Sequence, residues 1–166
     1  NSQVTIQRHQ SIAASKQKIT LGISLLKNAV RLEWLFEKAT EMGIHHIVPL
    51  ICERTIHERF KMDRMQNILQ SAMIQSQQAW LPLLCEPIAL NAFMQQQKAS
   101  VNLIAHCEPS DKKNIKEISA VDDVNLLIGP EGDFSSSEIA TAISNNYTPI
   151  QLGPTRLRTE TAGIFA

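Results

Sequence analysis

Short apolar runs alternate along this chain with amphipathic stretches. Six runs rich in branched and apolar residues are each the length of one buried strand, and they cover 19–26, 44–51, 84–90, 101–105, 124–128 and 149–153. Apolar residues recur at helical spacing in three stretches between them, 29–42, 63–80 and 91–97. Strands that alternate with helices in this way predict one α/β domain with a parallel sheet.

Residues that favour helix ends mark several boundaries. Gly43 follows the first amphipathic stretch and Pro82 follows the second, so each predicts the end of a helix. Ser135 and Glu138 have the spacing of a capping box, which predicts a further helix that begins there. Residues 108–122 are polar and are expected to form a connection without a buried strand.

Composition adds the size and the charge of this domain. The chain has 166 residues, of which 43% are hydrophobic, enough for a single core. Its 16 basic residues balance its 16 acidic residues, which excludes a nucleic-acid binder that works through bulk positive charge but leaves room for a local basic face. No apolar run approaches the roughly 18–20 residues of a membrane span, and no signal peptide is visible, so we expect a cytoplasmic protein.

Cysteines and histidines do not indicate a metal site. Cys52, Cys85 and Cys107 are odd in number and far apart, so we expect reduced thiols rather than disulfides or zinc ligands. His45 and His46 are adjacent, and in a strand they would point to opposite faces. We expect no bound metal.

Two unusual loops follow predicted strands near the C-terminus. Ligands of open α/β sheets bind outside the carboxyl ends of the strands. The first loop, 128–134, contains two glycines, which allow the backbone to approach a ligand closely. The second, 152–162, has two arginines, a glutamate and two threonines within seven residues. Neither matches a dinucleotide or P-loop fingerprint.

Each loop also has a purely structural interpretation. The first could be a tight turn that leads into the capped helix, and the arginines of the second could be solvated charges that pair with Glu160. Two loops of this kind in one third of the chain instead favour a shared pocket.

The sequences of these loops resemble a known family. The segment 126–135 reads L-L-I-G-P-E-G-D-F-S, and it is followed by Leu152-Gly153 and by L-R-T-E-T-A at 157–162. Together they are similar to the RsmE family, the 16S ribosomal RNA uracil-N3-methyltransferases of the SPOUT superfamily. The segment 38–43 resembles a helix end of that family and the segment 72–82 resembles one of its helices, so the resemblance covers about 19–166.

Two positions depart from the family pattern. Asp133 stands where the family usually has a second glycine, and Gln78 stands where it has a basic residue. The first places a carboxylate beside the expected pocket, and the second weakens any phosphate contact at that position.

The resemblance implies a fold and a domain organisation. It implies a SPOUT-type parallel sheet flanked by helices, in which 103–166 form a C-terminal deep trefoil knot. Residues 18–166 would be the methyltransferase domain, with a truncated C-terminal helix. Residues 1–17 would be a tail or linker left from an absent N-terminal PUA-like RNA-binding domain, whose last strand would survive at 4–6. SPOUT enzymes are homodimers, so a homodimer is expected.

The resemblance also implies a cofactor and the residues that bind it. S-adenosylmethionine would be bound in the knot, and no metal is needed because its methyl group is already activated. The expected cofactor-binding residues, mostly backbone groups and apolar walls, are Leu103, Gly129, Glu131, Gly132, Leu152, Gly153, Leu157 and Thr161.

Catalysis would require an uncharged imide nitrogen to lose its proton. Arg158 is our candidate for stabilising the charge that develops on the uracil, with Arg156 as the second candidate. Glu160 or Glu131 could act as the general base, and each could equally anchor backbone N–H groups.

The implied function is methylation of a uridine at N3 in the 16S ribosomal RNA of the small ribosomal subunit. One alternative is a SPOUT methyltransferase that acts on another base or on a ribose hydroxyl. The other is a catalytically silent module for RNA binding or assembly.

Overall fold

A computed structural model describes residues 17–166, with the exception of 58, 97–98 and 119–121. The expected strand at 4–6, and all of the expected tail except Gln17, lie outside these residues.

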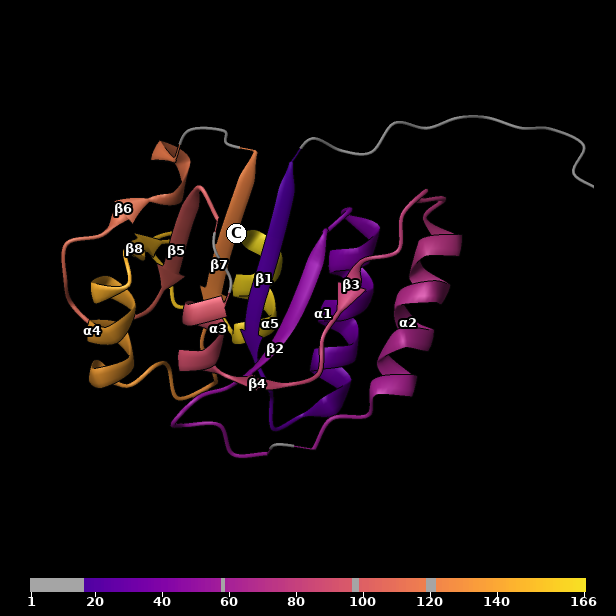
Figure 1. The fold of residues 1–166 in the computed structure, drawn as a ribbon, viewed down its shortest axis with the longest axis horizontal. Helices are drawn as coiled ribbons and strands as arrows, with labels where there is room; N and C mark the ends of the chain where they lie inside the picture. The colour runs from indigo at the N-terminus through magenta and orange to yellow at the C-terminus, as the bar shows by residue number, and fades with distance from the viewer. Residues whose placement is uncertain (1–16, 58, 97–98, 119–121) are drawn as a thin grey trace, which may run out of the picture.

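The described strands form one sheet in which every pairing is parallel, as the sequence predicts. The order across the sheet is β3-β2-β1-β7-β5-β8-β6, and β4 also pairs with β2 (Figure 1). The strands are β1 (Lys18–Ser24), β2 (His46–Ile51), β3 (Leu83–Leu84), β4 (Ile88–Ala89), β5 (Val101–Ala105), β6 (Lys113–Asn114), β7 (Asp123–Ile128) and β8 (Thr148–Gln151).

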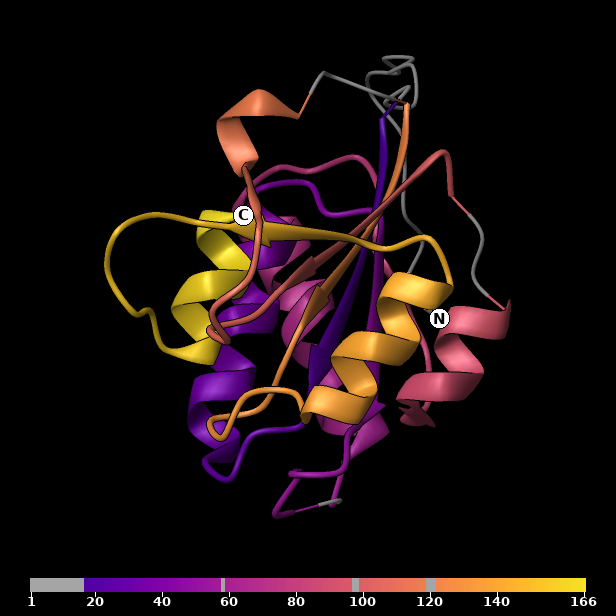
Figure 2. The same cartoon turned by 90° about the vertical axis from the view of Figure 1, so that its left-hand side faces the viewer.

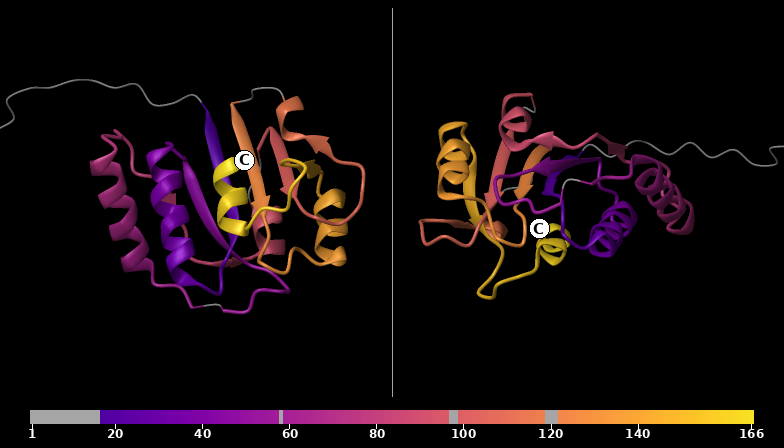
Figure 3. Two further views of the ribbon diagram at one scale, coloured as in Figure 1. Left: turned by 180° about the vertical axis from the view of Figure 1, so that it is seen from behind. Right: turned by 90° about the horizontal axis from the view of Figure 1, so that it is seen from below.

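Helices cover both faces of this sheet. Those on one face are α1 (Ala29–Glu41), α2 (Met62–Gln75) and α5 (Thr159–Phe165), and those on the other are α3 (Leu90–Gln96) and α4 (Ser136–Ser144) (Figures 1 and 3). The capping box at the start of α4 is confirmed, because Ser135 Oγ accepts a hydrogen bond from the Glu138 N–H and Glu138 Oε2 accepts one from the Ser135 N–H. No helix of the described residues is long and apolar enough to cross a membrane.

Three predicted elements differ from the structure. The helix expected over 63–80 ends at Gln75, because Gln77 has a φ of 56° and turns the chain away before Pro82 is reached. The strand expected at 84–90 is divided into the short strands β3 and β4, which both pair with β2. The polar connection contains β6 and a 3-10 turn, Ile115–Glu117.

The buried apolar side chains of the described residues form one cluster on each face of the sheet. Leu21 and Ile23 of β1 point toward α1 and α5, while Gly22 between them faces the opposite cluster. A Cβ at Gly22 would lie 2.8 Å from Leu127 Cδ2. The glycine therefore lets the second cluster pack directly against the backbone of β1.

Candidate active site

A cavity of about 690 Å³ opens at the carboxyl ends of β5, β7 and β8. Its walls are the ends of these three neighbouring strands and the residues that follow them, 105–107, 128–131 and 150–153, together with side chains of α1 and α5. The loop 152–158 leaves β8 and returns to α5 (Figure 2). The cavity thus lies at the edge of the sheet where ligands of α/β folds bind, and its size is that of a small-molecule site.

Seven of the eleven predicted site residues line this cavity. They are Gly129, Glu131, Leu152, Gly153, Arg156, Leu157 and Arg158. Both sequence loops therefore meet in one pocket, as expected.

The other four predicted residues lie outside the cavity lining. Leu103 is 4% exposed and belongs to the hydrophobic core, two residues before the end of β5. Gly132 faces Arg54, whose Nη1 donates hydrogen bonds to the carbonyl oxygens of Gly132 and Phe134 at 2.8 and 3.2 Å. Thr161 is exposed on α5, away from the lining.

The fourth, Glu160, is buried beneath the pocket in the first turn of α5. Its side chain is 9% exposed, and Oε1 lies 3.6 Å from the Nε of Arg31, which does line the cavity. Its Oε2 has no hydrogen-bond partner among the described residues. Glu160 therefore reaches the cavity through Arg31, which it holds in place.

Glu131 combines two properties. It is exposed at the cavity wall, and its Oε1 accepts a hydrogen bond of 3.1 Å from the backbone N–H of Lys27. The loop after β7 is thereby tied to the loop after β1, so the residue is an anchor as well as a carboxylate that a ligand can meet.

Several lining residues were missed by sequence reasoning. The end of β5 supplies Ala105, His106 and Cys107, and Arg31 and Lys112 add positive charge. The signal for the first three was available, because 101–105 was predicted as a strand and its carboxyl end lies at the same sheet edge as the two loops. Arg31 and Lys112 carry no such signal, since only tertiary packing brings them to the pocket.

The segment after β5 is fixed to the segment after β7 by polar contacts. Asp133 Oδ2 accepts a hydrogen bond of 2.7 Å from the Cys107 N–H, and Ser136 Oγ donates one of 2.6 Å to Glu108 Oε1. Two walls of the cavity are thus held at a fixed separation.

Comparison with known proteins assigns the family. The sequence model of the RNA methyltransferase domain matches residues 13–166. The chain belongs to this family of RNA methyltransferase domains. The cavity lies where the two loops that resemble this family predicted a site.

Relatives of this RNA methyltransferase domain include proteins of known sequence and known structure. The chain is 30% identical over 155 residues to the "Ribosomal RNA small subunit methyltransferase E" of Synechocystis sp., and the match covers 89% of this chain and 51% of that protein. The chain spans 51% to 69% of the length of the first curated relatives that it matches.

Two solved structures share the fold. A probable rRNA-methyltransferase from Porphyromonas gingivalis is 35% identical with a TM-score of 0.88, over 95% of this chain and 68% of that one. The ribosomal RNA small subunit methyltransferase E of Neisseria gonorrhoeae, bound to S-adenosyl methionine, is 29% identical with a TM-score of 0.79, over 89% of this chain and 62% of that one.

The first departure from the family pattern has a local explanation. Asp133 has a φ of 64°, in the left-handed region that glycine occupies without strain and that Asp tolerates better than most residues. Its Oδ1 accepts a hydrogen bond of 2.8 Å from the Phe134 N–H, and its Oδ2 accepts the bond from Cys107. In this methyltransferase domain the carboxylate therefore stiffens the pocket wall.

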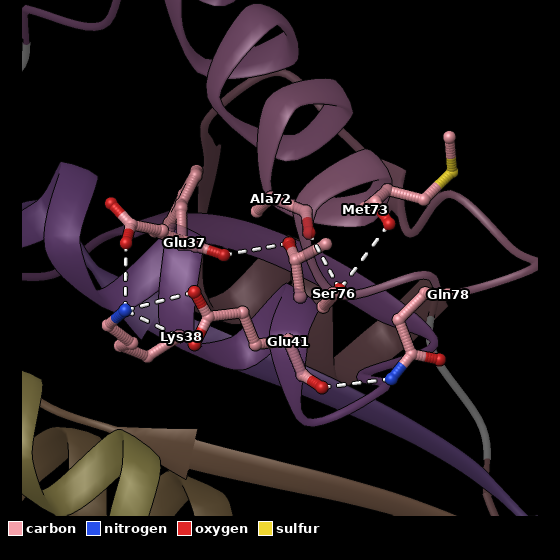
Figure 4. A network of polar contacts seen from close by, with 9 residues as sticks. Glu37, Lys38, Glu41, Ala72, Met73, Ser76 and Gln78 are labelled. Atoms are coloured by element: carbon pink, nitrogen blue, oxygen red, sulfur yellow. Dashed lines mark hydrogen bonds and ion pairs between the residues drawn. The ribbon is translucent and has the colours of Figure 1, made fainter.

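The second departure lies outside the cavity, at the junction of α1 and α2. Gln78 Nε2 donates a hydrogen bond of 2.9 Å to the carbonyl oxygen of Glu41, and Lys38 Nζ donates to Glu37 and Glu41 (Figure 4). Hydrogen bonds to Glu37, and then to Glu41, raise the pKa of Lys38. Gln78 joins two helix ends here and does not line the cavity.

Cysteines and histidines are dispersed. Cys52 is buried, Cys85 is partly buried and Cys107 is exposed, and all three are free. His46 Nε2 lies 3.1 Å from Cys85 Sγ. The described residues contain no group of three or more His, Cys, Asp or Glu side chains that could hold a metal ion.

Proposed function

We propose that this domain transfers a methyl group from S-adenosylmethionine to N3 of a uridine in the 16S ribosomal RNA of the small subunit. The observation that carries the proposal is the cavity, in which glycine-containing backbone from two loops meets arginine side chains. The names of the relatives from Synechocystis and Neisseria gonorrhoeae support both the reaction and the cofactor.

The residues of the cavity fit this cofactor. Gly153 lines the cavity, and a Cβ built there would meet no atom within 4 Å, so open space is available beside its backbone. Ile128, Leu152 and Leu157 provide apolar wall, and backbone groups of Gly129 and Gly153 would serve the purine. When bound, S-adenosylmethionine supplies a methyl group that is already activated for in-line transfer.

Positive charge dominates the side of the cavity that would receive the base. Arg156 and Arg158 are exposed, and both line the cavity together with Arg31. Arg158 is our candidate for binding the uracil carbonyl oxygens and stabilising the charge that develops as N3 loses its proton, with Arg156 second.

Of the two candidate bases, the geometry favours Glu131. It lines the cavity and is exposed, so it can take the N3 proton. Glu160 is buried and pairs with Arg31, so we assign it the positioning of that arginine.

The finer features of the fold belong to the same proposal. We propose that 103–166 form the trefoil knot, since β5 lies between β7 and β8 in the sheet and α5 returns past them to contact α1 and β7. Residues 1–17 would connect to an N-terminal RNA-binding domain. Ribosomal RNA is modified where ribosomes are assembled, so the site of action would be the cytoplasm.

A homodimer is proposed through α1 and α5. These helices lie side by side on one face of the sheet (Figure 3). They expose Val30, Trp34 and Phe165. Replacing Trp34 with Glu is expected to convert the dimer into monomers in light scattering. A wild-type chain that is monomeric at micromolar concentration would contradict the dimer.

The reaction is tested by incubating the chain with small ribosomal subunits and S-adenosylmethionine, followed by mass spectrometry of the RNA nucleosides. N3-methyluridine is the expected product. A different methylated nucleoside would replace the uridine assignment, and a folded chain that fails to bind the cofactor in calorimetry would be a silent binding module.

The role of Arg158 is tested by its alanine variant. Arg158→Ala is expected to abolish transfer while cofactor affinity stays within a few-fold. The matched control is Arg59→Ala, an exposed arginine outside the cavity lining, which should transfer normally. A large loss of cofactor affinity in Arg158→Ala would make that arginine a cofactor-binding residue instead.

A further inference from the structure

The imidazole of His106 is buried at the cavity wall without a hydrogen-bond partner among the described residues. The residue follows β5 and is 7% exposed, and it lines the cavity. Neither Nδ1 nor Nε2 of the ring has a hydrogen-bond partner among the described residues. Burying polar atoms without partners costs free energy, and nearly all such atoms in folded proteins are paired. The two unpaired ring nitrogens therefore indicate that a group bound in the cavity completes their hydrogen bonds.

The backbone around His106 is anchored even though its ring is not. Lys112 Nζ donates a hydrogen bond of 2.7 Å to the His106 carbonyl oxygen, and the next residue, Cys107, donates its N–H to Asp133. These contacts fix the position from which the ring extends. A ring that is held by its backbone and has free nitrogens is preorganised for a ligand.

The surroundings of His106 favour the neutral form of its ring, mainly because the residue is buried. Burial lowers the pKa of His106, and the nearby Lys112 lowers it further, whereas Asp133 and Glu108 act in the opposite direction. Both of these carboxylates already accept hydrogen bonds, from Cys107 and Ser136. The remaining charged residues of the cavity are Arg31, Glu131, Arg156 and Arg158.

A neutral imidazole has one N–H donor and one nitrogen acceptor. A hydroxyl group both donates and accepts, so it can pair with either ring nitrogen whichever tautomer is present. Carboxylates and phosphates only accept, and the arginines of the cavity suit them better.

We propose that His106 binds a ribose hydroxyl of the methyl donor through one of its ring nitrogens. This inference rests on the proposed function, because it takes the occupant of the cavity to be S-adenosylmethionine. It adds a side-chain contact to a pocket whose other nucleoside contacts are assigned to backbone groups and apolar walls.

The first experiment measures binding of S-adenosylhomocysteine by calorimetry. His106→Ala is expected to bind about 2- to 12-fold more weakly than the wild type, which corresponds to one lost hydrogen bond. His106→Gln keeps a donor and an acceptor and should recover part of the loss. His45→Ala removes an exposed histidine that precedes β2, outside the cavity lining, and should bind as the wild type does.

The second experiment identifies the ligand group by comparing adenosine with 2′,3′-dideoxyadenosine as competitors of S-adenosylhomocysteine. The wild type should prefer adenosine, and His106→Ala should bind the two nucleosides equally within a factor of about two. An unchanged preference in His106→Ala would overturn the contact. Thermal unfolding of each variant checks that it is folded, and His106→Leu, which also lacks a polar side chain, replaces His106→Ala if the latter is not.

The two proposals fail in different ways. If the wild type binds S-adenosylhomocysteine and His106→Ala binds it equally well, the inference about His106 is wrong and the proposed function stands. If the folded wild type binds no S-adenosylhomocysteine, both are wrong.

Discussion

A side chain added at Gly153 should block the cofactor without disturbing the fold. A Cβ at this position would meet no atom within 4 Å, and Gly153 is not among the described residues with positive φ. The backbone therefore accepts an L-residue, and the new side chain occupies space in the cavity. For Gly153→Val we expect a change in the free energy of unfolding within about 0.5 kcal/mol.

The loss of affinity can be estimated from the cost of overpacking. Forcing extra methyl groups into a filled site costs about 1–3 kcal/mol. Since about 1.4 kcal/mol corresponds to a tenfold change, Gly153→Val should bind S-adenosylmethionine about 5- to 150-fold more weakly. Calorimetry measures the affinity, and urea unfolding measures the stability.

Gly132→Val is the matched control for this variant. A Cβ at Gly132 would lie 3.5 Å from Arg54 Cδ, an ordinary contact, and Gly132 is outside the cavity lining. Its affinity should stay within about twofold of the wild type. The reasoning is refuted if Gly153→Val binds normally, or if Gly132→Val is the weaker binder of the two.

Two further predictions concern stability. Gly22→Ala should destabilise the domain by about 1–3 kcal/mol in urea unfolding, because its Cβ would lie 2.8 Å from a methyl group of the fully buried Leu127. An unchanged unfolding midpoint would contradict the tight packing of β1. Burial lowers the pKa of His46 and His106, so at acidic pH the unfolded chain binds more protons than the folded chain. The stability should therefore fall as the pH drops below about 6.5, by at most about 1.4 kcal/mol per pH unit for each histidine. Urea midpoints at several pH values test this. His46→Asn should make the dependence of stability on pH shallower, and an unchanged dependence would contradict the role of His46.

The sequence predicted the elements that have strong local patterns. The α4 capping box is a contact between residues three apart, so the residues themselves specify it. The parallel sheet followed from the alternation of strands and helices. The end of α2 was misplaced by several residues, because Pro82 was the visible stop while the positive φ of Gln77 has no strong sequence signal.

The cavity was predicted where glycines and arginines gather in the sequence, and it was missed where tertiary contacts bring distant residues together. Gly129 and Arg158 were found because their loops are unusual. From the sequence alone, Arg31 would be placed on the solvent-facing side of a helix. Only the return of α5 to α1 places Glu160 beside it. Gly132 was assigned to the pocket with its loop, yet it faces Arg54, since a loop pattern does not state which side of the loop meets the ligand.

Zero net charge is compatible with the RNA substrate that we propose for this domain. Among the described residues, four cationic side chains line it, those of Arg31, Lys112, Arg156 and Arg158, against the two carboxylates of Glu131 and Asp133. Both carboxylates accept hydrogen bonds from backbone N–H groups, which offset part of their negative charge. The acidic residues that balance the sum lie largely elsewhere, for example on α1, where Glu37 and Glu41 pair with Lys38. Under the proposed function, the charge that a phosphate backbone or an ionising uracil would meet is therefore the local excess of arginine and lysine, which the sum over the chain conceals.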